Sequence, residues 1–125
     1  MKHVVVSWFE IPVSDMERAM SFYGKVFDCQ LERNQMGPFD MAWFPWDHEQ
    51  KGAGGSLVRH KEDYQPSDKG VLVYFSSEDI DTELSKVKVA GGKVLQEKTL
   101  IAKDVGYMAL FTDSEGNRIA LHSQQ

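Results

Sequence analysis

The sequence predicts an α+β fold made of two pseudo-symmetric units, each with the element order βαβββ. The first observation is an internal repeat: at an offset of 64, Asp15-Met16-Glu17 aligns with Asp79-Ile80-Asp81. The loops that follow differ in length between the two copies, and after them Gly54–His60 aligns with Gly116–His122 at an offset of 62. The second observation is that each copy pairs a strand-like apolar segment with a helical segment that carries end signals. Two curved sheets set side by side would form a cleft, so the function should depend on what lines it.

The first unit is predicted over about residues 1–60. Residues 3–11 are rich in Val, Trp, Phe and Ile, as strands are, and Pro12 ends this strand because proline cannot donate to a ladder. Ser14-Asp15-Met16-Glu17 matches a capping box, so a helix should start at Ser14 and run to about Phe27. Three further strands are expected, at Leu31–Met36, Met41–Phe44 and Ser56–His60.

The second unit is predicted over about residues 70–125, after a polar linker at Arg59–Gly70. A strand at Val71–Ser76 precedes a helix at Asp79–Ala90, which Gly91-Gly92 should stop. The remaining predicted strands are Lys93–Thr99, Gly106–Thr112 and Asn117–His122, the last two joined by the turn Asp113–Gly116. We expect residues 1–125 to form a single domain.

Composition excludes several classes of partner. A net charge of −5 argues against nucleic-acid binding, which needs a basic surface. No apolar run approaches the roughly 20 residues of a membrane span, so no membrane partner is expected. The single cysteine, Cys29, cannot form an internal disulfide and fits a reducing compartment, which predicts a cytoplasmic protein.

Two motifs resemble the vicinal oxygen chelate superfamily, which includes glyoxalase I, extradiol dioxygenases and bleomycin- or fosfomycin-resistance proteins. One runs from Phe9 to Ala19 with Phe22-Tyr23 behind it, and the other is Phe111–Ile119, with the pattern aromatic-x-Asp-x-x-Gly-Asn. The resemblance implies that the two units pair into a cup-shaped, mostly antiparallel sheet with the helices outside. It implies no particular reaction, because one fold hosts many functions.

Enzymes of that superfamily hold a divalent metal in the cup with one His or Glu side chain from each of four strands. The resemblance carries these positions onto Trp8, Val58, Leu72 and Ala120. None of these side chains offers a nitrogen or oxygen ligand of the kind such metals need. We therefore expect no metal at the usual site and no cofactor.

The cup is predicted to be lined by aromatic side chains and a few polar groups, because side chains alternate along a strand. If Trp8 faces the cup, so does Glu10, and a four-residue turn at 113–116 would bring Tyr107 opposite His122 on the same face. Alternatively, Trp8 fills the cup itself, and Glu10, His60 and His122 face water. The predicted ligand-binding residues are Trp8, Glu10, His60, Tyr74, Tyr107 and His122.

Three functions remain open. The first is a small-molecule-binding protein that resembles the resistance-type members. The second is a metal-independent enzyme, lyase- or isomerase-like, in which Glu10 and His122 are the candidate catalytic acid and base. The third is a glyoxalase- or dioxygenase-like metalloenzyme with rearranged ligands, for instance Glu10, His60 and His122. A homodimer is expected because a cup-shaped sheet leaves edges that proteins usually cover. The two units can pair within one chain or exchange with a second chain.

Overall fold

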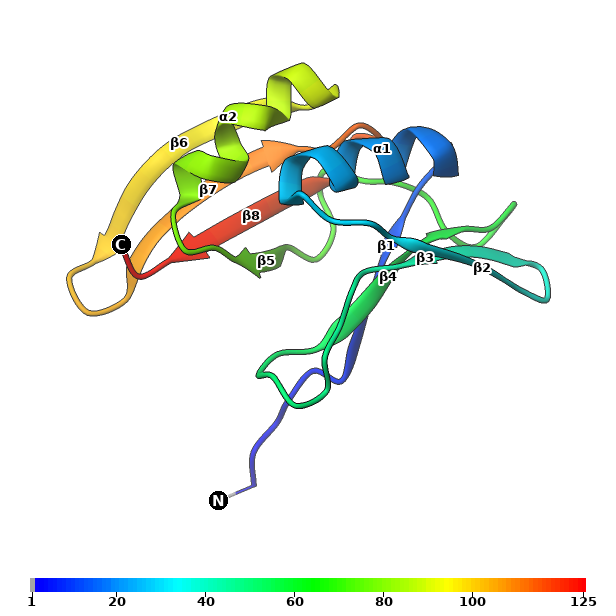
Figure 1. Ribbon diagram of the computed structural model, residues 1–125, viewed down its shortest axis with the longest axis horizontal. Helices are drawn as coiled ribbons and strands as arrows, with labels where there is room; N and C mark the ends of the chain where they lie inside the picture. Colours follow the sequence, from blue (N-terminus) through cyan, green and yellow to red (C-terminus); the bar gives the residue numbers. More distant parts are fainter. Residues whose placement is uncertain (1) are drawn as a thin grey trace.

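The computed structural model describes residues 2–125 as two four-stranded sheets and two α-helices (Figure 1). Sheet A has the strand order β1-β4-β3-β2, and sheet B has the order β5-β8-β7-β6. The first half of the chain contains β1 (Trp8–Pro12), α1 (Met16–Phe27), β2 (Glu32–Met36), β3 (Phe39–Trp43) and β4 (Gly54–Arg59). The second half contains β5 (Val73–Ser76), α2 (Ile80–Ala90), β6 (Lys93–Ala102), β7 (Gly106–Thr112) and β8 (Arg118–Ser123).

The predicted α+β class and the repeated βαβββ order are confirmed. Each sheet is mixed: β1 pairs with β4 in parallel, as β5 does with β8, and the other neighbours are antiparallel. The same pairing in both sheets matches the pseudo-symmetry that the repeat predicts. Within residues 2–125, no helix is long and apolar enough to cross a membrane.

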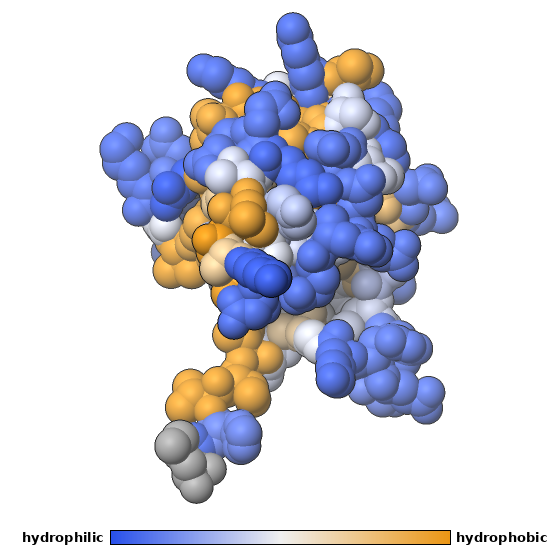
Figure 2. Space-filling model, turned by 90° about the vertical axis from the view of Figure 1, so that its left-hand side faces the viewer, coloured by the Kyte–Doolittle hydropathy of each residue, from blue (hydrophilic) through white to orange (hydrophobic). Residues whose placement is uncertain are grey.

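The first strand is shorter than predicted, and the chain before it forms an exposed arm. The strand expected over residues 3–11 covers only Trp8–Pro12. Val4, Val5 and Val6 are 94%, 79% and 71% exposed. Figure 1 shows this arm leading away from the sheets, and Figure 2 shows its apolar atoms projecting below the body. The valines favour a strand, but among residues 2–125 no strand pairs with them.

One core joins the two halves, and it defines an inner face for each sheet. Ile11 and Leu57 of sheet A and Phe111 and Leu121 of sheet B belong to the same buried cluster as the apolar stripes of α1 and α2. Phe9 and Phe75, from the two edge strands, meet in this region with ring centroids 5.5 Å apart. We call the opposite, helix-free face of each sheet its outer face.

The start of α1 differs from the predicted capping box. Asp15 is the N-cap and accepts the backbone N–H of Arg18, whereas Ser14 and Asp15 donate their own N–H groups to Glu115 of the second half. The expected reciprocal bond from Glu17 is therefore replaced by a carboxylate from far along the chain. The second helix agrees better with the prediction: Asp79 is its N-cap, and Gly91 ends it in the left-handed conformation.

The Asp-x-x-Gly-Asn motif has a structural role in holding the halves together. Asp113 accepts the hydroxyl of buried Tyr23 at 2.6 Å and the backbone N–H groups of Glu115 and Asn117. Asn117 donates to the carbonyl of Pro12 at 2.7 Å and accepts the N–H of Ser67. Burial and the adjacent Asp113 raise the pKa of Tyr23 well above its ordinary value, so the phenol stays a donor.

Candidate functional site

The outer face of sheet A carries two of the predicted site residues, Trp8 and Glu10. They lie two residues apart on β1, and the β1–β4 register sets Glu10 beside Ser56. Ser56 pairs in turn with Trp43 of β3. The indoles of Trp8 and Trp43 meet edge to face at 5.6 Å, and they are 36% and 38% exposed. The result is an aromatic surface open to solvent beside a carboxylate.

A third indole extends this surface. A side chain at Gly54 would meet the ring of Trp46 at 2.9 Å and that of Trp8 at 3.2 Å, so both rings lie against this glycine. Neither Trp43 nor Trp46 was predicted to line the site. Strand alternation from Met41 would have placed Trp43 on the outer face, but Trp46 lies in a loop where no periodicity applies. We call Trp8, Trp43 and Trp46 the tryptophan surface.

The linker supplies a polar partner for Glu10. The hydroxyl of Tyr64 donates to Glu10 Oε1 at 2.5 Å, and this hydrogen bond is the main cause that raises the pKa of Tyr64. His60 orders this part of the linker, because its Nδ1 accepts the backbone N–H groups of Glu62 and Asp63. Its ring also packs on Phe39 at 4.7 Å. No local pattern points to Tyr64, which lies 54 residues from its partner along the chain.

The outer face of sheet B carries Tyr74, His122 and an unpredicted arginine, Arg118. Tyr74 pairs with Ala120, which places these two and the flanking Arg118 and His122 on one face of β5 and β8. His122 Nε2 lies 2.7 Å from the carbonyl oxygen of Val105, to which it donates. Tyr74 is 50% exposed. Alternation from Ala120 would have predicted Arg118 on this face.

The predicted register of the last hairpin is wrong, and with it the place of Tyr107. His122 pairs with Met108, and Tyr107 pairs with Ser123. The turn contains one residue more than expected, because Asp113 and Asn117 close it and Thr112 pairs with Arg118. A one-residue shift turns a side chain to the other face of the sheet. Tyr107 therefore packs against the inner core, with Lys98 Nζ 4.8 Å from its ring centre.

The four positions carried over from the metal enzymes do not fit a metal. Trp8 and Val58 lie on the outer face of sheet A, and Leu72 and Ala120 lie on that of sheet B. Their side chains have no ligand of the kind divalent metals prefer. Across residues 2–125, no three His, Cys, Asp or Glu side chains are grouped closely enough to hold a metal ion.

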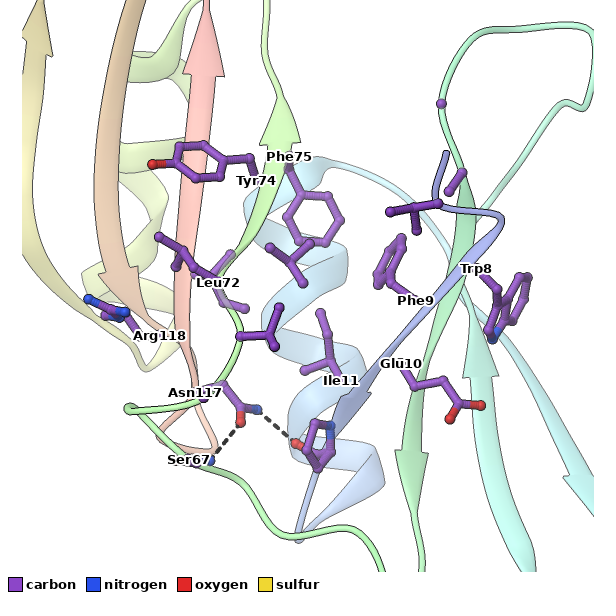
Figure 3. A pocket seen from close by; sticks show the side chains of 18 of the residues that line it. Trp8, Phe9, Glu10, Ile11, Ser67, Leu72, Tyr74, Phe75, Asn117 and Arg118 are labelled. Atoms are coloured by element: carbon purple, nitrogen blue, oxygen red, sulfur yellow. Dashed lines mark hydrogen bonds between the residues drawn. The ribbon is translucent and has the colours of Figure 1, made fainter. Parts of the chain in front are cut away.

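The outer faces of the two sheets diverge in one chain. Figure 3 shows Trp8 and Glu10 projecting to one side and Leu72, Tyr74 and Arg118 to the other, with Phe9 and Phe75 between them. The predicted cup is therefore not shown within a single chain. Glu10 and His122 also lie on different sheets, so the structure does not bring this predicted pair together.

A groove of about 840 Å³ runs between the edge strands β1 and β5. Both strands are terminal in their sheets, so each presents an unpaired edge to it. Asn117 crosses one end through its bonds to Pro12 and Ser67 (Figure 3). The apolar lining includes Val6, Phe9, Ile11, Val73, Phe75 and Ile119.

Comparison with known proteins agrees with this architecture. A family model described as Glyoxalase/Bleomycin resistance protein/Dioxygenase superfamily matches residues 2–121. Among solved structures, the glyoxylase/bleomycin resistance protein/dioxygenase domain from Frankia sp. EAN1pec is similar with a TM-score of 0.74 and 16% identity. That match covers 99% of this chain and 100% of the other. No curated protein matches the sequence.

Two further solved structures are similar to this chain but differ in how much of their own length it covers. TnmS3, an antibiotic binding protein from Streptomyces sp. CB03234, has a TM-score of 0.65 and 26% identity, over 100% of this chain and 99% of its own. Glyoxalase I from Zea mays has a TM-score of 0.68 and 19% identity, over 94% of this chain. Only 45% of the maize chain is covered, so the present chain spans less than half of its length. The maize likeness therefore shows the fold alone.

Proposed function

We propose that this chain, which belongs to the Glyoxalase/Bleomycin resistance protein/Dioxygenase superfamily, is a small-molecule-binding protein without the usual metal site. The observation that carries the proposal is the tryptophan surface on sheet A. Three partly exposed indoles next to one carboxylate are suited to a flat or conjugated organic molecule, because stacking contributes about 1 kcal/mol per ring beyond area burial. The antibiotic-binding neighbour supports this class of function.

The polar groups of the site would orient the ligand rather than supply most of its affinity. Glu10, held by Tyr64, presents carboxylate oxygen at one end of the tryptophan surface. Tyr74 and His122 would form a separate contact surface on the outer face of sheet B, which points away from the tryptophan surface in one chain. His60 acts by ordering the linker that carries Tyr64. Ligand pockets typically combine such an apolar lining with a few placed polar groups.

The arrangement favours binding over the predicted acid–base reaction. That reaction needs Glu10 and His122 near one carbonyl group, yet they lie on different sheets and His122 already donates to Val105. A rearranged metal site formed by Glu10, His60 and His122 is disfavoured for the same reason, because His122 lies on the other sheet. In addition, His60 Nδ1 already accepts two backbone N–H groups.

We further propose a cytoplasmic homodimer whose protomers are each a single domain of residues 1–125. The apolar arm at Val4–Val6 and the unpaired edges of β1 and β5 support association, because exposed strand edges are usually covered. Two-fold pairing is the commonest way to cover them.

Calorimetric titration with a panel of planar polycyclic compounds tests the function. Trp8→Ala should weaken binding by about 2 kcal/mol, roughly 30-fold, because a partly desolvated aromatic contact is lost. His122→Ala should have a smaller effect. Val89→Ala, an exposed position on α2, is the control and should leave affinity unchanged. Absence of any binding in the unaltered protein would contradict the proposal. Loss of turnover of a carbonyl compound in Glu10→Gln, with binding intact, would favour the enzyme.

A further inference from the structure

The outer face of sheet A carries negative charge that no basic side chain on the same face balances. Glu10 of β1 and Glu32 of β2 lie on this face, beside Ser56 and Trp43 respectively. No lysine or arginine occupies an outer-face position on the strands of this sheet as the structure describes them. Arg59 is turned to the helix side, where it donates to a backbone carbonyl ahead of α1. The face is therefore aromatic and acidic.

The segments that border this face add to its negative charge. The loop that carries Trp46 and the part of the linker that ends at Tyr64 together contain four carboxylates and two lysines: Asp47, Glu49, Lys51, Lys61, Glu62 and Asp63. Among residues 2–125, no ion pair includes Glu10. Its side-chain hydrogen bond comes from the neutral hydroxyl of Tyr64 and uses Oε1. Oε2 is therefore available to a ligand.

The tryptophan surface suits a cation as well as a flat apolar ring. A π-system is negative on its face, and tryptophan attracts cations more strongly than other aromatic side chains do. Figure 3 shows Trp8 and Glu10 projecting to the same side. A neutral ligand that covered the indoles would take water away from the Glu10 carboxylate and give it no partner, which is unfavourable. A cation would replace that water with an opposite charge.

A buried hydroxyl without a partner lies next to this carboxylate. Ser56 is fully buried, and its Oγ has no hydrogen bond within residues 2–125. The strand pairing sets Ser56 between Glu10 and Trp43 on the outer face. Buried polar groups are normally hydrogen-bonded, so an unpaired oxygen at this depth indicates a place for a donor. One of the two flanking side chains must turn aside when that donor enters.

We propose that the tryptophan surface binds an organic cation, a flat aromatic molecule with a protonated amine, whose N–H groups donate to Glu10 Oε2 and Ser56 Oγ. The ring stacks on the indoles, and the charged nitrogen reaches the floor between β1 and β3. The inference rests on the binding function proposed above, and adds the charge class of the ligand and the role of Ser56. Neutral molecules of the same shape keep only the stacking contacts, and anions are repelled.

Calorimetric titration with three acridines of similar shape tests the charge preference. At slightly alkaline pH, 9-aminoacridine is a cation, acridine is neutral and acridine-9-carboxylate is an anion. We expect 9-aminoacridine to bind about 10-fold more tightly than acridine, because it adds a charge-assisted hydrogen bond and a cation–π contact. Acridine-9-carboxylate should bind most weakly. Added salt should weaken the binding of 9-aminoacridine and leave that of acridine unchanged, because only the cation is screened from the acidic face.

Two variants separate the polar contacts from the stacking. Glu10→Gln keeps the shape of the side chain and should lower the affinity for 9-aminoacridine about 10-fold, to that of acridine. Ser56→Ala should lower it about 3-fold without lowering the stability of the free protein, since the lost hydroxyl has no partner there. Trp43→Ala should instead weaken the binding of all three acridines. Circular dichroism checks that each variant is folded.

The matched control is Glu97→Gln, an exposed carboxylate on sheet B, which should leave all three affinities unchanged. A preference for the cation that survives in Glu10→Gln would overturn the role of the carboxylate, and unchanged cation binding in Ser56→Ala would overturn that of the hydroxyl. Equal affinity for the three acridines contradicts the charge class but leaves the binding function standing. If none of the three binds, the binding function fails as well, so the two failures are distinguishable.

Discussion

At the scale of single residues, Glu115 connects the two halves through charge-assisted bonds. Its buried carboxylate accepts the side chain of Arg18 at 2.7 Å and the N–H groups of Ser14 and Asp15. Burial by itself would raise the pKa of Glu115, but the hydrogen bonds from Arg18, Asp15, Ser114 and Ser14 outweigh it and lower the pKa. The N-terminal end of α1 also favours a negative charge at this place.

Glu115→Gln should destabilise the protein at neutral pH by about 2 kcal/mol, because hydrogen bonds to a charged acceptor are lost. The folded pKa lies below the unfolded one, so the stabilisation is present above the ordinary value of 4.5 and disappears as the pH falls through the folded pKa. Urea unfolding across pH measures this. Glu97→Gln, exposed and without a side-chain partner in the described chain, is the control, and a pH-independent difference would contradict the account.

At the scale of elements, the close approach of β1 and β4 depends on Gly55. A Cβ at this position would lie 2.3 Å from the ring of Phe9, which packs against Phe44 and Phe75 in the core. The missing side chain therefore leaves room for the ring of Phe9 beside Gly55, from where it contacts Phe75 of the second half.

Gly55→Ala should destabilise the fold by about 1–3 kcal/mol, because the ring of Phe9 must move within a packed cluster. Gly70→Ala provides the matched control: its Cβ would meet open space, and we expect a change within about 0.5 kcal/mol. Thermal and urea unfolding give both values. Equal stability of the two variants would show that Phe9 can move freely.

The elements that sequence predicts best are those with local signals. The helix α2 begins one residue after the expected Asp79, which is its N-cap, and it stops at Gly91 as expected, because the glycine signal acts within one turn. The N-cap of α1 was misplaced, since Glu115 comes from the other half of the chain. The predicted position of Tyr107 was wrong for a related reason. The side chain of Asp113 determines the length of the turn, and the turn length determines which residues of β7 and β8 pair.

At the scale of the whole molecule, a shared core makes the two halves one structure. Phe9 and Phe75 meet across it, Tyr23 of α1 donates to Asp113, and Asn117 binds the carbonyl of Pro12. Neither half alone supplies the partners for these contacts and hydrogen bonds. The relative orientation of the two outer faces is also a property of the whole molecule. The sequence identified Trp8, Glu10 and Tyr74 as facing away from the helices, but strand alternation carries no information on how two sheets are set against each other.

The chain should therefore unfold in a single cooperative transition, with the calorimetric enthalpy equal to the van't Hoff enthalpy. Differential scanning calorimetry measures both quantities. Two separate transitions, or a fragment of residues 1–60 that folds with native stability, would contradict a common core. If the chain forms the proposed dimer, the midpoint should also depend on protein concentration, without a second transition.

The tryptophan surface has an optical consequence. The chain contains three tryptophans, and Trp8, Trp43 and Trp46 all lie on or over the outer face of sheet A. Sheet B and both helices contain none. Intrinsic indole emission therefore originates from one face of one sheet. A molecule that stacks there, or a partner that removes water from it, will change the intensity and wavelength of nearly the whole signal. Events confined to sheet B will pass almost unseen, so the protein carries its own spectroscopic probe at the place where we expect binding.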